Sequence, residues 1–346
     1  MARFERINLD AAEWGRRLST FPDRIVHQSP AYIAFLAETQ KAEPVLAALK
    51  EGNETLGHYT GLIVRKFGLK ILGSPFRGWS TPYMGFNLLP TVPRRTAVEA
   101  LSDFASRELG CIHVEVTDFH LTPEDIRGSG FGHEVHATIV NDLTQTEEAL
   151  FRNMNSYRGR DIRQAEKHGV RIEEARAPEF AEEFAAQFKD VFAKQGMTPH
   201  FGAERIRAVI KHLSPTGMLL LLRARDPAGH CIATGVFAGM EPAAFYWAGA
   251  SWRQHQDLHP NELLQWHAMK YWKSRGMKTY DLAGTMDFKR RFGGSEVAAL
   301  MIHKSKYRWL KRLRSAAMPL GRAVLRLAWK LKGGVKGKSA VSLLCS

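Results

Sequence analysis

The chain has 346 residues, 45% of them hydrophobic, and carries 49 Lys and Arg against 35 Asp and Glu, a formal charge of +14. The surplus is local: twelve basic residues lie from Lys304 onward, no Asp or Glu follows Glu296, and residues 1–303 hold 37 basic and 35 acidic side chains. This distribution excludes a uniformly basic protein that coats nucleic acid and describes a nearly neutral globular body with a basic tail.

The length and the spacing of the cysteines further limit the class of protein to which the chain can belong. The length suggests roughly two domains of about 150 residues each. Cys111, Cys231 and Cys345 are too widely spaced for a disulfide framework or a zinc-binding pair. The N-terminus lacks the apolar region of a signal peptide, and the longest apolar run, around Met218–Leu222, is far shorter than the ~20 residues of a membrane span. We therefore expect a cytoplasmic protein.

The first half alternates helices and strands. Ser29-Pro30 is typical of a helix N-terminus, and an antiparallel meander of strands is expected to follow it. A loop rich in Gly, Pro and aromatic residues separates that meander from a helix that ends at Gly110. In chain order, strands are predicted at residues 45–50, 56–66 and 69–72, a helix at 94–109, and further strands at 111–116 and 133–143.

The second half repeats this order. Helices are predicted over residues 147–154 and 157–168, followed by a strand at 170–175 and a long amphipathic helix at 178–194. Three strands with turns between them come next, and then a helix that ends at Gly276 and leads into a short strand. These elements are residues 218–225, 231–239 and 243–250, the helix 260–275, and strands 278–282 and 297–303.

Each half therefore reads as helix, meander, helix ended by Gly, and strand, which indicates a duplicated α/β (α+β) domain with a mixed, mainly antiparallel sheet flanked by helices. This is the element order of the acetyltransferase (GNAT) fold, although any pair of α+β domains would also satisfy it. We predict a first domain over residues 1–140, a second, catalytic domain over 141–303, and a basic amphipathic tail over 304–346.

A first motif is a row of cations. Arg160, Arg163 and Lys167 follow i, i+3, i+7 spacing on a predicted helix, with Arg158 close by. Such a row can clamp phosphate or carboxylate groups of a substrate, and Arg supplies a bidentate fork. A solvated helix face with local ion pairs is the alternative.

A second motif follows the strand that ends at Asp281. Phe288 and Phe292 bracket a basic segment that includes Lys289 and Arg291, and Gly293-Gly294 precede the last strand. A lysine fixed between two aromatic anchors at a strand end is placed to stabilise a developing oxyanion. An ordinary surface loop is the alternative.

A third motif joins a strand containing Trp247 to a helix that begins near Pro260. Glu262 lies in the first turn, and the N-terminus of such a helix is where an anionic ligand binds. His259 and His267 flank this turn, but no Glu or Asp stands at metal-ligand spacing, so we expect no metal. The chain has no Walker loop, no G-x-G-x-x-G and no G-x-S-x-G.

Two of these segments resemble a known family. Ile162–Val170 is similar to the I-R-x-A-x-K-x-G-V segment of FemAB-like proteins, and residues 261–294 look like that family's second-half signature. The resemblance implies a tandem GNAT-fold acyl or aminoacyl transferase. It also implies a peptide of a cell-wall precursor as acceptor and aminoacyl-tRNA as donor, with no tightly bound cofactor and no metal.

Residue by residue, the resemblance assigns catalysis to Lys289, which matches the lysine of the F-K-x-x-F-G motif, and places Asp281 as the strand-end acid. Arg163 and Lys167 match the family's basic helix, and Tyr83 looks like part of its first-domain substrate loop. We count Arg158, Arg160, Trp247, Glu262 and Arg291 with these as candidate substrate-binding residues. One departure is Gly159, which stands where the family often has Arg, so the register of the cationic row is open.

A second departure concerns the donor. The chain lacks the R/Q-x-x-G-x-G/A loop with which GNAT enzymes hold coenzyme A, which favours another acyl donor without excluding acyl-CoA. The expected reaction is amide formation on an amine, with Asp281, Glu262 or the substrate itself as base. The alternatives are a coenzyme-A-dependent N-acyltransferase acting on a sugar or lipid amine, and a non-catalytic module that docks on a membrane or RNA.

The tail carries an apolar stripe at helical spacing with basic residues on the other faces. Such a helix suits an anionic membrane surface on the inner face of the membrane, tRNA phosphates, or the protein body itself. The candidate membrane-binding residues are Trp309, Lys311, Arg312, Arg314, Arg322, Arg326 and Trp329.

Overall fold

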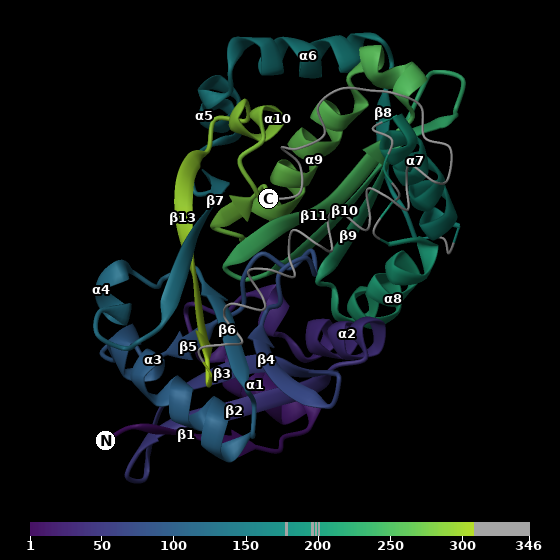
Figure 1. Cartoon of the computed structure of the whole chain (residues 1–346). Coiled ribbons are helices and arrows are strands. Elements are labelled where there is room, and N and C mark those ends of the chain that lie inside the picture. The colour runs from purple at the N-terminus through teal and green to yellow at the C-terminus, as the bar shows by residue number, and fades with distance from the viewer. Residues whose placement is uncertain (177–178, 195–196, 198, 200, 308–346) are drawn as a thin grey trace.

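The computed structural model describes residues 1–176, 179–194, 197, 199 and 201–307 (Figure 1). The tail predicted to bind a membrane, from Trp309 to Trp329, lies outside these residues. Within the described part of the chain, no helix combines the length and apolarity that crossing a bilayer requires.

A single mixed sheet runs through both halves of the molecule. Its strand order is β1-β2-β3-β4-β6-β13-β7-β12-β11-β10-β9-β8, and β5 pairs with β3 outside this path. The first half contributes β1 (Arg3–Ile7), β2 (Glu43–Glu51), β3 (Glu54–Lys66), β4 (Leu69–Ser74), β5 (Phe86–Leu88), β6 (His113–Asp118) and β7 (Gly132–Asp142). The second half contributes β8 (Arg171–Glu174), β9 (Leu219–Arg225), β10 (Cys231–Met240), β11 (Ala243–Ser251), β12 (Thr279–Asp281) and β13 (Ser295–Ser305).

Helices cover both halves of the sheet (Figure 1). Those of the first half are α1 (Ala11–Ser19), α2 (Pro30–Gln40), α3 (Arg94–Asp103) and α4 (Pro123–Ile126), with a 3-10 turn at Val26–Gln28 and a π-helical turn at Phe104–Glu108. Those of the second half are α5 (Glu147–Asn153), α6 (Ser156–Lys167), α7 (Phe180–Lys194), α8 (Ala203–Leu213), α9 (Pro260–Ser274) and α10 (Asp287–Arg290), with 3-10 turns at Ser214–Thr216 and Arg253–Leu258.

The predicted duplication is visible in the strand pairing. In the first half β4 pairs in parallel with β6 across helix α3, and in the second half β11 pairs in parallel with β12 across helix α9. The two halves then exchange their last strands. Strand β13 pairs with β6 of the first half, while β7 pairs with β12 of the second half. Strands β7 and β13 also pair with each other, so a two-stranded ribbon links the halves (Figure 1).

The fold agrees with most of the expected elements, including the antiparallel meander of β2, β3 and β4 and the helix that ends at Gly110, where φ is +68°. Sequence patterns missed β1, α1, β5, α4, α8 and α10. Several of these are very short: β5 has three residues, and α4 and α10 have four each. Segments of that length contain too few residues to establish a hydrophobic period. The predicted boundary at residue 140 falls inside β7, the strand that crosses between the halves.

Candidate active site

Strands β11 and β12 separate soon after they meet. Their parallel pairing covers only Ala243–Phe245 against Thr279–Asp281, while β11 runs on to Ser251. The pairing of β11 with β10 is also irregular, because Val236 pairs with Ala248 but Phe237 pairs with Tyr246, which makes Trp247 the bulged residue. Bulges are common next to active sites because they redirect a strand and its side chains. We call this divergence of β11 and β12 the opening at the end of β12.

Asp281 lies buried at this strand end and is 2% exposed. Its Oδ2 accepts a hydrogen bond of 2.6 Å from the Tyr83 hydroxyl, and its Oδ1 accepts one from Thr138 Oγ1 and one of 2.6 Å from the Ala283 N–H. Burial raises the pKa of Asp281, whereas its three donors favour the carboxylate. The acid is thus held by both halves of the molecule, since Tyr83 belongs to the loop that follows β4.

Lys289 faces the same strand end from helix α10. Its Nζ donates a 2.5 Å hydrogen bond to the Ala283 carbonyl and lies 5.7 Å from the centre of the Tyr246 ring. Burial lowers the pKa of Lys289 to about 8, and the nearby Asp281 charge acts in the opposite direction. A Cβ at Gly284 would stand 3.2 Å from this Nζ. Asp281 and Lys289, both predicted to be catalytic, are therefore neighbours in one partly enclosed place.

Arg158 is not on the surface. The residue is 2% exposed, and its guanidinium lies 4.5 Å from the ring centre of Phe288 and 4.6 Å from that of Phe292. Nη1 donates to Glu262 Oε1 at 2.5 Å and Nη2 to the Phe288 carbonyl at 3.1 Å. Arg158 therefore binds the segment that carries Lys289 to helices α6 and α9, and its guanidinium faces protein groups.

The glycines that follow Phe292 fit closely against the neighbouring chain. Gly293 has φ of +76°, and a Cβ on it would collide with the Asn153 carbonyl. A Cβ on Gly294 would approach the Val140 carbonyl to 2.7 Å. The Asn141 side chain donates to the Phe292 carbonyl at 2.8 Å. Both glycines are thus required for this loop to dock on the β7 end and on the junction of α5 and α6.

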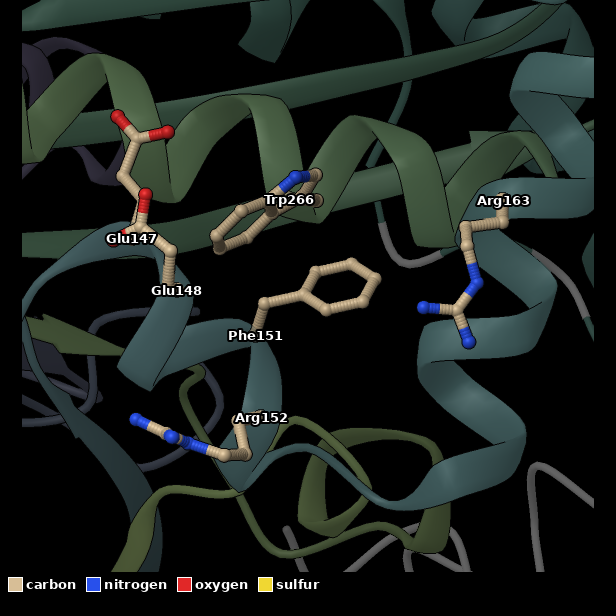
Figure 2. Close-up of a pocket in the computed structure, with 6 residues that line it drawn as sticks. All are labelled: Glu147, Glu148, Phe151, Arg152, Arg163 and Trp266. Carbon is tan, nitrogen blue, oxygen red and sulfur yellow. The ribbon is translucent and has the colours of Figure 1, made fainter.

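The other predicted cations are exposed. Arg160 stacks on the ring of its neighbour Tyr157, and Arg291 pairs with Asp287 at 2.6 Å. Lys167 lies on the exposed side of α6. Arg163 lies over the Phe151 ring and, together with Trp266, helps to line an open pocket of about 530 Å³ between α5, α6 and α9 (Figure 2). Arg152, Glu147 and Glu148 complete its lining.

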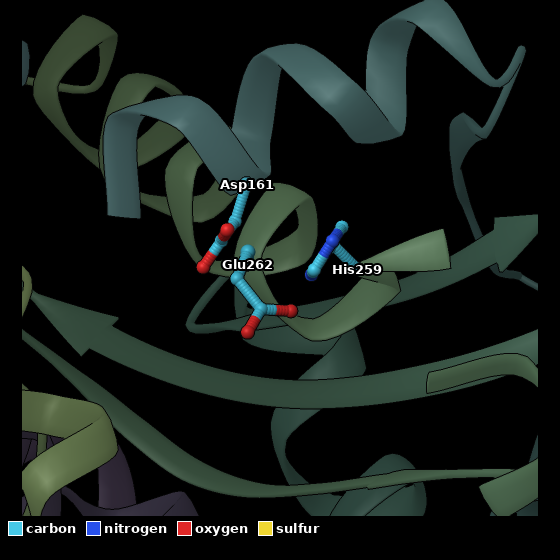
Figure 3. Close-up of side chains that lie close together, drawn as sticks. All are labelled: Asp161, His259 and Glu262. Atoms are coloured by element: carbon cyan, nitrogen blue, oxygen red, sulfur yellow. The ribbon is translucent and has the colours of Figure 1, made fainter. Parts of the chain in front are cut away.

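The N-terminus of α9 brings together residues that are far apart in sequence. Ligand atoms of Asp161, His259 and Glu262 lie within 4.8 Å of one another (Figure 3). No metal site was expected, because no Glu or Asp was found at metal-ligand spacing, but the fold adds Asp161 from α6 to this cluster. Arg158 Nη1 already lies 2.5 Å from Glu262 and 3.7 Å from Asp161, so a protein cation is paired with both acids.

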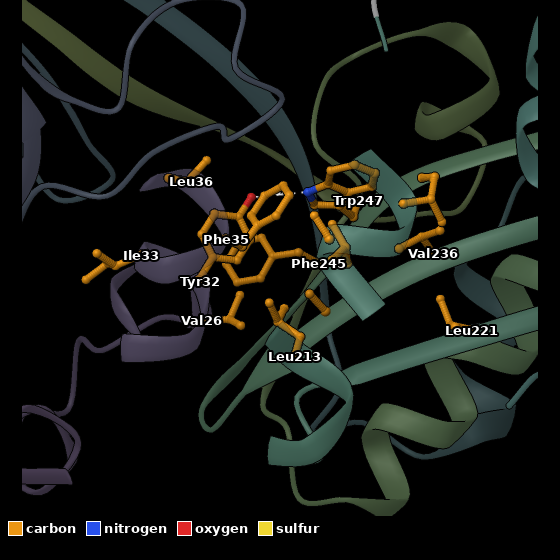
Figure 4. Packing of buried hydrophobic residues seen from close by; sticks show 14 of the residues in the cluster. Val26, Tyr32, Ile33, Phe35, Leu36, Leu213, Leu221, Val236, Phe245 and Trp247 are labelled. Atoms are coloured by element: carbon orange, nitrogen blue, oxygen red, sulfur yellow. Dashed lines mark hydrogen bonds between the residues drawn. The ribbon is translucent and has the colours of Figure 1, made fainter. Parts of the chain in front are cut away.

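Trp247 points into the core that joins the halves (Figure 4). Its Nε1 donates to the Tyr32 hydroxyl at 3.1 Å, and Tyr32 OH is 3.0 Å from Thr81 Oγ1. Trp247 was predicted to bind substrate, but the structure places it on β11, 9% exposed and hydrogen-bonded to Tyr32 of helix α2.

Sequence reasoning missed two members of the site, Thr138 and Tyr246. Thr138 bonds Asp281 and also accepts the Gly284 N–H at 2.8 Å, yet on β7 it reads as an ordinary strand residue. Tyr246 stands directly before Trp247, and only Trp247 was singled out in this strand. Burial raises the pKa of Tyr246 to about 12, so its hydroxyl stays protonated. No pattern in the sequence distinguishes Tyr246 from the other residues of this strand.

Comparisons with known proteins agree with this architecture. Residues 152–290 match the family described as acetyltransferase (GNAT) domain. No curated protein matches the sequence. Among solved structures, FemX superposes with a TM-score of 0.71 at 14% identity, covering 86% of this chain and 96% of FemX.

Two further structures are similar. The C-terminal domain of a putative lysylphosphatidylglycerol synthetase from Agrobacterium fabrum has a TM-score of 0.52 at 12% identity, covering 95% of this chain and all (100%) of that one. A tandem GNAT protein from the clavulanic acid biosynthesis pathway has a TM-score of 0.50 at 10% identity and covers 89% of this chain and 99% of that one. At such identities the likeness concerns the fold, and it confirms the predicted tandem GNAT architecture.

Proposed function

We propose that this chain is a FemAB-like acyltransferase of the GNAT superfamily and that it forms an amide bond between an aminoacyl ester and an amine of a cell-envelope precursor. The observation that carries the proposal is the position of Lys289. Its ammonium is anchored on the Ala283 carbonyl beside the buried Asp281, at the point where β11 and β12 separate. A reacting carbonyl group placed in that opening would meet a fixed positive charge.

Lys289 serves the reaction in two ways. The acceptor nitrogen attacks the carbonyl carbon, the C–N bond forms, and negative charge develops on the carbonyl oxygen, where the ammonium stabilises it. When the tetrahedral intermediate collapses, the C–O bond breaks and the leaving oxygen needs a proton. A lysine whose pKa is lowered to about 8 is still mostly protonated at neutral pH and is acidic enough to supply that proton.

Asp281 and Glu262 are better placed as fixed charges than as bases. Asp281 already accepts three hydrogen bonds, and Glu262 is bound to Arg158. A base must come within hydrogen-bond reach of the proton that it removes, and Asp281 is only 2% exposed. We therefore assign Asp281 to holding the lysine charge in place. The acceptor amine reacts as its neutral fraction, and the proton that its nitrogen loses as the amide forms passes to solvent, from which Lys289 is reprotonated.

The start of α9 favours an aminoacyl ester over coenzyme A as donor. A helix N-terminus binds pyrophosphate through free N–H groups and a positive dipole end. Here Pro260 at the first position has no N–H, and the Glu262 carboxylate occupies the first turn. This first turn therefore offers one N–H fewer to a pyrophosphate, and its acid is already paired with Arg158. Aminoacyl-tRNA is accordingly the proposed donor and therefore a partner, and coenzyme-A-dependent acylation of a sugar or lipid amine is the second candidate.

The experiment is a transfer assay with the full chain. Bulk tRNA charged with radiolabelled amino acids serves as donor, and a nucleotide-linked muramyl peptide serves as acceptor; acetyl-CoA with amino sugars is the parallel arm. Lys289→Ala should lower kcat by about 100-fold or more, as the loss of an oxyanion donor does elsewhere. Arg290→Ala is the matched control, because its neighbouring side chain is 48% exposed and pairs with Glu296. Equal turnover of Lys289→Ala and wild type would remove Lys289 from the mechanism.

We further propose that the basic tail holds the enzyme on the inner face of the membrane, where lipid-linked envelope precursors are found. Ten Lys and Arg and no acid lie in residues 308–346. Such a segment gains about 1 kcal/mol for each basic residue near an anionic surface. Vesicles that contain anionic lipid should co-sediment the full chain but not a chain ending at residue 307, and neutral vesicles should co-sediment neither. Equal pelleting of both forms would refute the membrane role.

A further inference from the structure

We propose that Arg158 is the positioning residue of this enzyme: it holds the turn that carries Lys289 without touching the substrate. The inference rests on the proposed function, because Lys289 is taken as the catalytic residue. It differs from the sequence-based expectation, which placed Arg158 among the substrate-binding cations of α6.

The first argument is where the guanidinium lies. Phe288 and Phe292 stand directly before and three residues after Lys289, and both rings lie within 4.6 Å of the Arg158 guanidinium carbon. The two rings are 5.4 Å apart with planes inclined at 70°. One planar cation therefore contacts both aromatic residues that flank Lys289, which fixes the direction in which this short helical turn presents its lysine.

The second argument is the pattern of hydrogen bonds. Nη2 donates to the Phe288 carbonyl, which belongs to the peptide group that joins Phe288 to Lys289. Nη1 donates to Glu262 on α9. Asp161, one turn further along α6, lies 3.7 Å from the same Nη1. A single side chain thus ties α6, α9 and α10 together. Among the described residues, the Lys289 ammonium donates to the Ala283 carbonyl, so its position depends on how its turn is held.

The third argument is that only arginine can make all of these contacts at position 158. Stacking against two rings while donating two divergent hydrogen bonds requires a planar fork, which the point charge of lysine does not supply. The neighbouring Arg160 is a natural comparison. Its side chain is 57% exposed and stacks on Tyr157, so it shares the helix and the charge of Arg158 but not its contacts with the lysine turn.

Loss of Arg158 should therefore change the position and the surroundings of the Lys289 ammonium. Lys289 faces Asp281 on β12, the Tyr246 ring on β11 and the Ala283 carbonyl. If the turn loosens, the ammonium moves away from this set and gains water. A shift of about 1 Å in a catalytic group lowers rates by about 100-fold. The substrate contacts elsewhere stay as they are.

The kinetic test uses Arg158→Met, Arg158→Lys and the control Arg290→Ala in the transfer assay described above. For Arg158→Met we expect kcat to fall about 10- to 100-fold with KM within about twofold of wild type. Arg158→Lys should recover only a small part of that loss, and Arg290→Ala, whose side chain is 48% exposed, should keep kcat. A raised KM with unchanged kcat in Arg158→Met would overturn the proposal and assign Arg158 to substrate binding.

A second measurement needs no substrate. The rate at which acetic anhydride labels Lys289, followed by peptide mass spectrometry across pH, reports the pKa of that lysine. The wild-type midpoint is expected near 8. In Arg158→Met it should rise toward the ordinary value of about 10.4, while Arg160→Met leaves it unchanged. An unchanged midpoint in Arg158→Met, with the other lysines labelled as in wild type, would refute the positioning role even if Lys289 proves catalytic.

Phe288→Leu covers the case in which Arg158→Met does not fold. Leucine removes one ring from the guanidinium and leaves every charge in place. We expect the labelling midpoint of Lys289 to move in the same direction by a smaller amount, and kcat to fall about 3- to 10-fold. If both Phe288→Leu and Arg158→Met fold, the double variant should lose less activity than the two single losses combined predict, because both substitutions act on one contact. Additive losses would contradict a shared role.

Discussion

The hydrogen bond between Tyr83 and Asp281 joins the two halves of the molecule at the candidate active site, and Tyr83→Phe removes only that bond. The donor and acceptor are 2.6 Å apart, and both residues are at least 95% buried. A hydrogen bond to a charged acceptor contributes about 1.5–3 kcal/mol, and a buried acceptor left without its donor loses most of that. We therefore expect the free energy of unfolding to fall by about 2 kcal/mol at neutral pH.

The same bond has a pH signature. Burial raises the pKa of Asp281 above 3.8, and the Tyr83 hydrogen bond opposes that rise. In wild type, the raised folded pKa means that stability is lost as pH rises from 3.8 through the folded value. Tyr83→Phe raises the pKa of Asp281 in the folded state further. Its deficit relative to wild type is therefore full above that pKa, where Asp281 is ionised, and shrinks as pH falls through it.

Urea unfolding at several pH values measures both effects. Tyr157→Phe is the matched control, because that tyrosine is 56% exposed and should change stability by less than about 0.5 kcal/mol. The reasoning fails if Tyr83→Phe is as stable as wild type at pH 7, or if its deficit is the same at low pH as at neutral pH. Either result would mean that the Tyr83 hydroxyl does not stabilise an ionised Asp281.

Three further outcomes are expected. Gly293→Ala should lower stability in chemical denaturation by more than about 2 kcal/mol, since its Cβ meets the Asn153 carbonyl, whereas Gly276→Ala, with φ of +80° and open space around it, should lose only about 1 kcal/mol. Turnover should decline as pH rises through about 8, because Lys289 must be protonated, and Lys289→Arg should move that limb upward in a pH–rate profile. Trp247→Phe should destabilise the protein by about 1 kcal/mol through the lost bond to Tyr32 and leave kcat/KM within about twofold; a large rise in KM would instead support a substrate role for Trp247.

Much of the architecture could be predicted because it is encoded locally. Apolar periodicity, Pro30 at a helix start and glycines at helix ends mark elements within a few residues, so most of the strands and helices in both halves were predicted in their correct order. Lys289 and the two Phe residues beside it lie in one short segment, and Asp281 ends the strand just before it. A motif of that kind is visible in the sequence because its members are close along the chain.

What only the tertiary structure decided involves residues that are distant in sequence. Tyr83 and Asp281 are 198 positions apart, and the exchange of β7 and β13 places Thr138 beside Asp281. Nothing local encodes such pairings, because strand partners are chosen by the packing of the whole sheet. The same holds for burial: Arg158 and Arg160 look alike in a run of cations, yet one is enclosed by two rings and the other is in water. The sequence alone identified the charged groups, and the fold determined which of them contact each other and which remain exposed to solvent.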